Sequence, residues 1–394
     1  MSKSSTKVIS QTIRASEPAQ PLEEKASSPV KGTARLVSLD AFRGFIMFWI
    51  VGGGSLMLGL QALGHNRVID TIIYHLNHTP WEGLRFYDCI WPCFMLMVGV
   101  SVPFSYAKRS LTQTHSQMWA HTLKRVAVLF LLGSLRESLH LGSLYLVEIS
   151  SALQPIAIAY LMAFLLARKS PRFQAATGAL ILAGYALLLA LVPAPGIAAG
   201  SYKLNANLVY AVDIALLGKM HPVDQSEIVE GWGTVLSTIP TVSTTILGLL
   251  IGGLLRSSRS AKSKMKIMFI IGTGGLVTGY ASSPVIPVVM KMWTTSYGIL
   301  TASWACLLFL LFYWIIDVRG YRKWAFPFVV IGANALAAYL GGTVTRLHDI
   351  VSVLTRGAEA PLGSFGPLFG AVAFLGVEWL ILYWMYQRKI FLSA

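Results

Sequence analysis

Charged side chains are scarce in this sequence. Lys, Arg, Asp and Glu together make up 12% of its 394 residues, whereas roughly 25% is usual in a soluble domain. Apolar residues make up 55%, and the mean hydropathy is +0.61. This balance excludes an ordinary soluble enzyme, because too few polar side chains remain to cover its surface. The sequence predicts an all-α, polytopic membrane protein.

Cysteine is also nearly absent. The three cysteines, Cys89, Cys93 and Cys306, all lie inside apolar runs. No disulfide framework follows from this pattern, and no Cys and His occur together at the spacing of a zinc site. We interpret the three as small buried hydrophobic residues and expect no metal.

Long apolar runs are abundant. A spanning helix needs about 20 mostly apolar residues. Ten segments of this kind lie at about 40–62, 87–106, 121–139, 148–167, 174–194, 232–255, 265–281, 296–316, 325–345 and 366–386. The third and fourth are the weakest, because Arg136, Glu137, Glu148 and Gln154 lie in or beside them.

The basic residues predict the orientation, because Lys and Arg accumulate in cytoplasmic loops. With the N-terminus inside, 23 basic residues fall on the cytoplasmic side and seven outside, while Arg43 and Arg136 lie within spans. The chain is therefore predicted to have both termini in the cytoplasm and to lie in the inner (cytoplasmic) membrane. The net charge of +15 reflects this topology, with anionic lipid head groups as partners, so a nucleic-acid partner is not expected.

Two segments lie outside this pattern of spans. Residues 1–38 are rich in Ser, Pro, Glu and Lys, which predicts a disordered cytoplasmic tail before a membrane domain at 39–394. The outer loop at 195–231 is too long for a simple connector. Its apolar stretch from Leu204 to Leu217 predicts a short helix that covers the outer face.

Polar residues inside spans are costly and often functional. Asp40 and Arg43 share a helix face at the start of the first span, where they pair as a functional group or as an anchor at the interface. Gln154 is followed by Pro155, which can kink the fourth span. Asn334 lies among small residues in the ninth span, which suits a hydrogen bond between packed helices.

The segment from His78 to Ser101 is the most informative. His78 and the turn Trp81-Glu82-Gly83 precede Asp88, which stands at the start of the second predicted span. An imidazole titrates near neutral pH and is a common general base or nucleophile. The prediction is a proton-transfer site at the membrane surface. A lone surface histidine with an aspartate that only caps its helix is the plainer alternative.

Several motifs together resemble the heparan-α-glucosaminide N-acetyltransferase family of transmembrane enzymes. They occur in the family's order over roughly residues 35–345. The matching segments are Ser38–Phe45, His78–Gly83, Asp88–Phe94, Gly99–Ser101, Leu153–Gln154, Leu236–Pro240, Lys291–Ser296 and the Asn334 segment. The form Met47-Phe-Trp-Ile-Val-Gly-Gly is most similar to the bacterial branch.

The resemblance implies an enzyme that moves an acetyl group from cytoplasmic acetyl-CoA to an amino sugar beyond the membrane. It places the family's catalytic histidine at His78. Two departures limit what is carried over: the luminal domain of lysosomal members does not precede the match, and Gly52–Gly54 stand where those members have an asparagine. The acceptor is therefore predicted only as an amino sugar or related glycan.

His78 either takes a proton from the acceptor or carries the acetyl group itself, and the sequence leaves both routes open. Asp88 or Glu82 would orient the imidazole, and Trp81 would exclude water. The anionic donor is expected against Lys108, Arg109, Lys124 and Arg125, with its thin pantetheine arm between helices. Whether the acceptor nitrogen or oxygen is acetylated, and whether the protein is a homodimer, both stay open.

A multi-span transporter or flippase is the competing interpretation, since Gly and Pro breaks and a mid-span Asn also suit a substrate pathway. A coupled carrier would be expected to place more ionisable residues at mid-depth. A non-catalytic membrane scaffold would explain none of the motifs.

Overall fold

The computed structural model describes residues 36–141, 152–216 and 235–392. In the first half of the chain the helices are α1 (Val37–Gln61), α2 (Arg67–Leu76), α3 (Ile90–Arg109), α4 (His115–Leu141), α5 (Leu153–Leu166), α6 (Pro171–Leu191) and α7 (Leu208–Leu216). In the second half they are α9 (Thr238–Arg256), α10 (Ala261–Ser282), α11 (Thr295–Tyr313), α12 (Phe326–Ala333), α13 (Ala335–Val344), α14 (Leu347–Glu359) and α15 (Gly366–Gln387). Short helical turns occur at Tyr87–Cys89, Trp314–Val318, Lys323–Ala325 and Ala360–Phe365, and a two-residue hairpin pairs β1 (Tyr202–Lys203) with β2 (Ala206–Asn207).

These elements support the prediction of an all-α membrane protein but not the count of ten spans. Each predicted segment coincides with a helix or helix pair, yet in the described ranges only six are long and apolar enough to cross a membrane. A seventh results if α12 and α13, which meet at a bend of 62°, form one broken span. The helix α5 is shorter than a normal span.

Close helix crossings hold the bundle together. The most extensive contact is between α3 and α9, followed by α10 with α11 and α1 with α12. A Cβ atom at Gly99 would lie 1.9 Å from the carbonyl oxygen of Thr245, and one at Gly248 would lie 2.0 Å from that of Leu96. Only glycine allows the α3 and α9 backbones to approach this closely. This crossing fixes α3, which carries the site described below.

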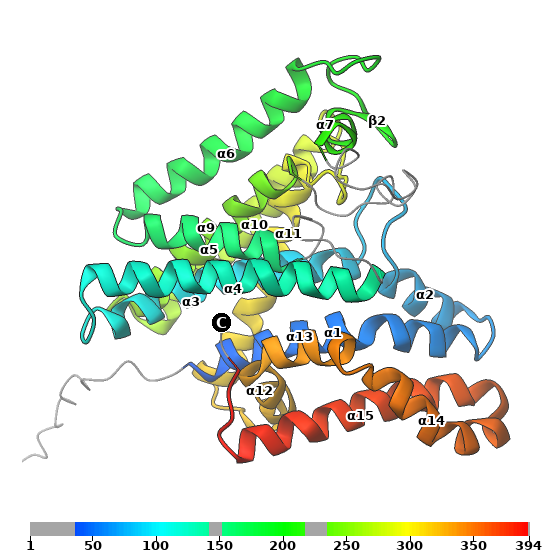
Figure 1. Ribbon diagram of the computed structural model, residues 1–394. Coiled ribbons are helices and arrows are strands. Elements are labelled where there is room, and N and C mark those ends of the chain that lie inside the picture. Colours follow the sequence, from blue (N-terminus) through cyan, green and yellow to red (C-terminus); the bar gives the residue numbers. More distant parts are fainter. Residues whose placement is uncertain (1–35, 142–151, 217–234, 393–394) are drawn as a thin grey trace, which may run out of the picture. The chain divides into compact units, whose positions relative to one another are not determined.

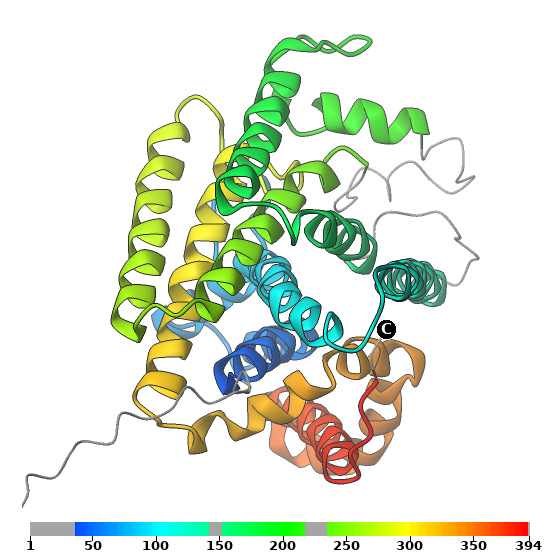
Figure 2. The same ribbon diagram turned by 90° about the vertical axis from the view of Figure 1, so that its left-hand side faces the viewer.

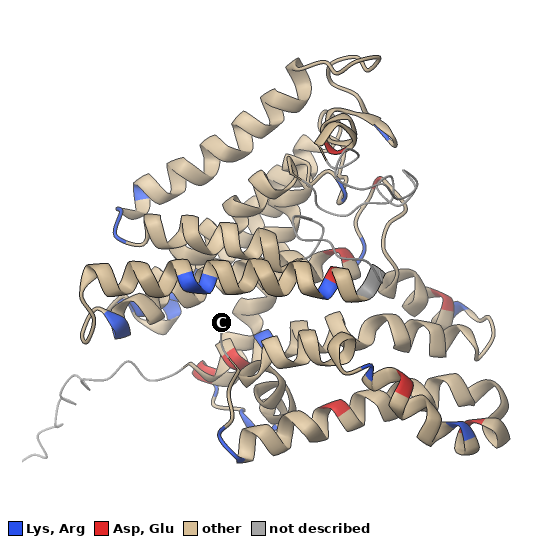
Figure 3. Ribbon diagram, in the orientation of Figure 1, with Lys and Arg blue, Asp and Glu red and all other residues tan. Residues whose placement is uncertain are grey.

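The helices α1, α3, α4 and α15 run nearly side by side and define two ends of the bundle (Figures 1 and 2). Lys and Arg concentrate at one of them, which we call the basic end: the turns after α3, α5, α9 and α11 and the C-terminus of α15 (Figure 3). Here α1 begins, with Val37 and Ser38 donating backbone N–H groups to the Asp317 carboxylate, 3.2 Å each. Leu36, the N-cap of α1, and Val37 and Ser38 thus belong to the start of this helix, whereas residues 1–35 of the predicted tail lie outside the described residues.

The predicted ninth span is broken at Asn334. Its side chain does make a long-range hydrogen bond, but to the segment that follows α15: Nδ2 donates to the Ile390 carbonyl at 3.0 Å, and Oδ1 accepts from Leu392 N at 3.1 Å. The span was therefore wrongly predicted as one continuous helix. In the outer loop the expected short helix is α7, which begins later than Leu204; the rest of the loop from 217 lies outside the described residues.

Candidate active site

The loop between α2 and α3 carries the predicted histidine. Its backbone is fixed to the segment before α11: Gly83 N donates to the Val288 carbonyl at 2.8 Å, and Glu82 pairs with Val289. Gly83 has a φ of +126°, which glycine adopts without strain. The Trp-Glu-Gly turn therefore positions the loop, and this backbone requirement accounts for Gly83.

Asp88 is the centre of the site. Its carboxylate accepts hydrogen bonds from His78 Nδ1 at 2.8 Å and from Arg85 N at 2.9 Å. Thr79 adds its hydroxyl at 2.6 Å and its backbone N–H at 3.3 Å. The Asp88 side chain is completely buried. These donors come from the preceding loop rather than from the first turn of α3, so Asp88 anchors the loop and does not merely cap the helix.

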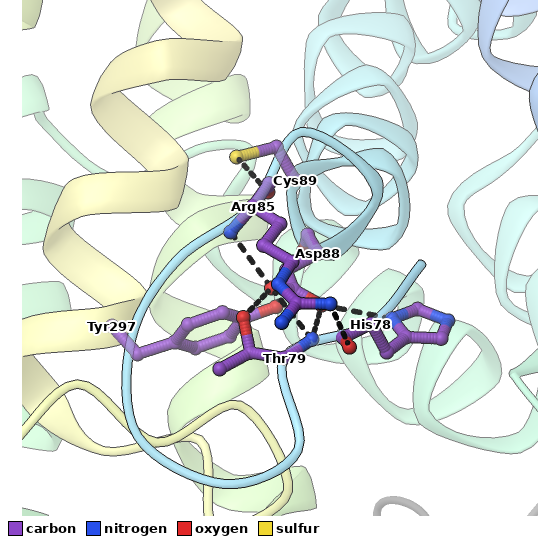
Figure 4. A network of polar contacts seen from close by, with 6 residues as sticks. All are labelled: His78, Thr79, Arg85, Asp88, Cys89 and Tyr297. Atoms are coloured by element: carbon purple, nitrogen blue, oxygen red, sulfur yellow. Dashed lines mark hydrogen bonds and ion pairs between the residues drawn. The ribbon is translucent and has the colours of Figure 1, made fainter. Parts of the chain in front are cut away.

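The contact with Asp88 sets the chemistry of His78. An ionised carboxylate only accepts hydrogen bonds, so Nδ1 carries the proton of a neutral imidazole and Nε2 carries the lone pair. The ring projects from the network with its second nitrogen directed away from Asp88 (Figure 4). His78 is 31% exposed, so an incoming molecule can reach the ring while the carboxylate stays dry. This is the geometry of a general base or a nucleophile.

Two further residues, Arg85 and Tyr297, hold His78 and Asp88 in place. The Arg85 guanidinium donates to the His78 carbonyl at 2.9 Å and lies 4.0 Å from the centre of the Tyr74 ring. The buried Tyr297 hydroxyl donates to the Asp88 carbonyl at 2.7 Å (Figure 4). The sequence reasoning missed both, although Tyr297 directly follows the motif ending at Ser296.

The Tyr87 ring requires a glycine at position 53 of α1. Its ring centre lies 4.7 Å from that of His78, and its hydroxyl donates to the Trp49 carbonyl at 3.2 Å. A Cβ atom at Gly53 would come within 2.5 Å of the Tyr87 ring. Gly53 thus leaves room for the Tyr87 ring, which packs against the imidazole.

Trp81 and Glu82, which are neighbours in the sequence, make different contacts. Trp81 Nε1 donates to the Tyr202 carbonyl at 2.8 Å, so the indole ties the histidine loop to the β1–β2 hairpin of the outer loop. Burial raises the pKa of the Tyr202 phenol, which therefore stays neutral. Glu82 is exposed and contributes its backbone to the pairing with Val289. Of the two alternatives for orienting the imidazole, Asp88 is the one whose contact with His78 the structure shows.

A cavity of about 320 Å³ lies beside α3. The α3 residues in its wall include Trp91, Phe94, Val98, Ser101 and Ser105, which form one face of the helix. At 1.5 Å per residue this face is about 21 Å long, roughly two thirds of the thickness of a membrane core of about 30 Å. Trp91 lies one turn after Asp88, and Ser105 lies near the basic end. The cavity therefore runs from the neighbourhood of His78 toward the basic end.

Two arginines enter this cavity. Arg43 pairs with Asp40 at 2.6 Å, as predicted, and Arg125 lies 4.4 Å from the centre of the Tyr160 ring. Arg43 Nε, Arg125 Nε and Trp91 Nε1 are buried, and none has a hydrogen-bond partner among the described residues. These donors point to a polar or anionic ligand, because an unpaired buried donor is costly.

The four basic residues predicted to bind the donor differ in their surroundings. Arg109 donates to the Tyr160 hydroxyl at 3.4 Å, which brings it to the same tyrosine as Arg125. Lys108 and Lys124 are exposed and do not line the cavity. The sequence did not identify Tyr160, which lies far along the chain from both arginines and has no motif around it.

The remaining candidates have packing roles. Gln154 is fully buried and donates to the Ser134 hydroxyl at 3.0 Å, beside the cavity residue Leu153. Cys93 and Cys306 are buried as free thiols, and Cys89 is half-buried. Within the described ranges, no three His, Cys, Asp or Glu side chains converge as metal ligands.

The sequence is distantly similar to a known protein. No family model matches the sequence. Over 370 residues the chain is 24% identical to heparan-alpha-glucosaminide N-acetyltransferase of Homo sapiens, a match that covers 79% of this chain and 53% of the human protein. The chain thus spans about half the length of this relative. The protein that carries the His78–Asp88 pair is similar to an N-acetyltransferase.

Proposed function

We propose that this protein is a transmembrane acetyltransferase that moves an acetyl group from acetyl-CoA to an amino sugar or related glycan. The single observation that carries the proposal is the position of the cavity beside α3, which begins one turn after Asp88 and extends toward the basic end. The distant similarity to an N-acetyltransferase supports the same class of reaction. Neither lipid nor nucleic acid is needed as a reactant.

His78 performs the chemistry at one end of this path. As the acceptor amine or hydroxyl attacks the thioester carbonyl, Nε2 takes its proton, the C–S bond breaks and the sulfur leaves as the CoA thiol after protonation. On the second route Nε2 attacks the thioester carbonyl first, the C–S bond breaks and the CoA thiolate leaves. The acetyl group stays on Nε2 as an acyl-imidazole until the acceptor attacks it, breaks the bond to Nε2 and gives up its proton to the freed nitrogen. In both routes Asp88 fixes the tautomer and stabilises the positive charge that develops on the ring.

The donor occupies the rest of the path. Its phosphates would lie toward the basic end, near Arg43, Arg109 and Arg125, where guanidinium groups suit phosphate geometry. Its pantetheine arm is thin and largely apolar, and the cavity wall is mostly apolar as well. The two exposed lysines, Lys108 and Lys124, would add only a screened attraction.

Sidedness follows from the charge pattern. With the basic end in the cytoplasm, the donor is loaded from inside and His78 faces outside, which agrees with Lys and Arg accumulating on the cytoplasmic side. The enzyme would then lie in the inner membrane and modify glycans that have already crossed it. The outer loop, linked to the site through Trp81, would cover the acceptor.

The test is acetyl-CoA consumption by the purified protein against a panel of amino sugars and glycans. We expect release of the CoA thiol together with an acceptor that gains the mass of one acetyl group. Product tandem mass spectrometry distinguishes N- from O-acetylation. Binding of a panel member without acetyl-CoA turnover, and its movement across a vesicle membrane, would instead support the transporter alternative.

A further inference from the structure

A second cavity lies on the other side of α1, away from the proposed chemistry. It has a volume of about 390 Å³, within the range of small-molecule sites. Its wall comes from α1, α12, α13 and α15, with Met47, Phe48, Ile331, Leu375 and Leu382 among its apolar residues. Met47 is the one residue that it shares with the cavity beside α3.

One acidic residue interrupts this apolar wall. Glu378 stands near the middle of α15 and is 7% exposed. Its Oε1 is buried and has no hydrogen-bond partner in the part of the chain that the structure describes. The only other polar group of the wall, Trp379 Nε1, already donates to the Pro327 carbonyl at 3.1 Å. The cavity therefore offers a ligand one carboxyl group in apolar surroundings.

The surroundings define which molecules can enter. On α15 the neighbouring residues Val372, Leu380 and Ile381 are 55%, 59% and 43% exposed, as expected of a surface that faces lipid. A ligand must therefore come from the membrane and must itself be largely apolar. No Lys, Arg or His lines the cavity, so a phosphate or other anionic head group has no partner there.

The carboxyl selects for one functional group. Ionised and unpaired, it would cost several kcal/mol in such a place, so the neutral acid is the stable form without a cation. A neutral acid both donates and accepts a hydrogen bond, and a hydroxyl group does the same. An alcohol therefore satisfies the carboxyl without creating charge, whereas a hydrocarbon leaves it unpaired.

We propose that the cavity between α1, α12 and α15 binds an uncharged lipid-phase alcohol, with its hydroxyl hydrogen-bonded to Glu378 and its apolar chain along α1 and α12. This site does not depend on the acetyltransferase activity. It makes the protein responsive to a membrane component through α1, which also carries Arg43 and Met47 of the other cavity.

Photolabelling of the full-length protein in phosphatidylcholine vesicles tests this site. The probe is a hexadecanol with a diazirine in its chain, and the competitors are unlabelled hexadecanol and hexadecane. We expect labelled residues on α1 and α15, with hexadecanol competing about tenfold better than hexadecane, the difference of one net hydrogen bond to a buried acid.

Three variants and one matched control separate the effect of the cavity's shape from that of its carboxyl group. A Cβ atom at Gly376 meets nothing within 4 Å, so Gly376→Leu fills the cavity without a clash and should reduce labelling at least about fivefold. Gly274→Leu, which also has open space but lies on α10, is the matched control and should label normally. Glu378→Leu should abolish the preference for the alcohol, whereas Glu378→Gln should keep most of it, because an amide also donates and accepts.

Folding is checked by thermal unfolding of each variant in the same vesicles. The proposal is overturned if the wild type is not labelled at this site, if hexadecane competes as well as hexadecanol, or if Gly376→Leu labels like the wild type. Unchanged alcohol preference in Glu378→Leu would overturn the role of the carboxyl. Acetyl transfer is not the readout, so these results are independent of the proposed function.

Discussion

Two regions of the proposed site differ in how their polar groups are paired. The Asp88 carboxylate beside His78 accepts several hydrogen bonds, whereas N–H groups in the wall of the cavity beside α3 have no acceptor among the described residues. The Asp88 carboxylate receives four hydrogen-bonding groups from its own loop, within ten residues along the chain. In the cavity wall, Arg43 Nε, Trp91 Nε1 and Arg125 Nε have no partner among the described residues. The first region is complete as it stands and orients one ring. The second is completed only by a ligand that brings acceptors.

A second pair of the same residue types sharpens this comparison. His65 Nδ1 contacts Asp70 Oδ1 at 2.9 Å, nearly the distance found for His78 and Asp88. The His65 and Asp70 side chains are 84% and 50% exposed, whereas the Asp88 side chain is fully buried. Exposed pairs contribute little, because water competes for both partners. Distance alone therefore does not distinguish a catalytic pair, but burial and the number of supporting donors do.

The largest expected effect is at His78. His78→Ala should lower kcat for acetyl transfer by about 10²–10⁴-fold, the usual contribution of a positioned general base. The Kd for acetyl-CoA, measured by calorimetry, should change little, because the ring lies beyond the end of the cavity. His75→Ala is the control, since His75 is exposed and outside the Asp88 network. Turnover of His78→Ala within a few-fold of wild type would remove His78 from the chemistry.

The second-largest loss of kcat is expected at Asp88. Asp88→Asn keeps the shape but favours the tautomer with the proton on Nε2. The kcat should fall on the order of 10²-fold, the lower end of what a positioned general base contributes. Asp70→Asn breaks the exposed pair instead and should leave kcat unchanged. Nitrogen-15 NMR of the labelled histidine reports the tautomer directly. Equal losses in the two variants would show that burial of the carboxylate does not matter.

The cavity should respond in donor affinity rather than in rate. Arg125→Ala should weaken acetyl-CoA binding about tenfold, or about 1.4 kcal/mol, and added salt should weaken wild-type binding further by screening. Arg259→Ala removes an exposed arginine at the same end of the bundle and serves as the control. A wild-type Kd that does not vary with salt would contradict a phosphate site at this end.

The smallest effect is expected at the link to the outer loop. Trp81→Phe removes the hydrogen bond to Tyr202 but keeps the aromatic contact, a loss of about 1 kcal/mol that should raise the acceptor KM roughly fivefold. Trp384→Phe, at a 53% exposed position on α15, is the matched control. If the acceptor KM is unchanged in Trp81→Phe, the loop is only a connector.

The parts of the site predicted from sequence are those built locally. His78 and Asp88 lie ten residues apart in one loop, and Asp40 and Arg43 lie one turn apart on one helix, so short-range spacing was enough. The meeting of Arg109 and Arg125 at Tyr160 depends on how α3, α4 and α5 pack, which hydropathy does not encode. The break at Asn334 was missed for a similar reason: it has no proline, and the segment that bonds to its side chain lies more than fifty residues later.

Transfer across a membrane tests the account most directly. The protein is reconstituted in sealed vesicles with acetyl-CoA outside and the acceptor inside, and both compartments are analysed by mass spectrometry. The account predicts acetylated acceptor inside while free CoA stays outside, and no product with His78→Ala. Product only when donor and acceptor share a compartment, or CoA found inside the vesicles, would contradict a path from the basic end to His78.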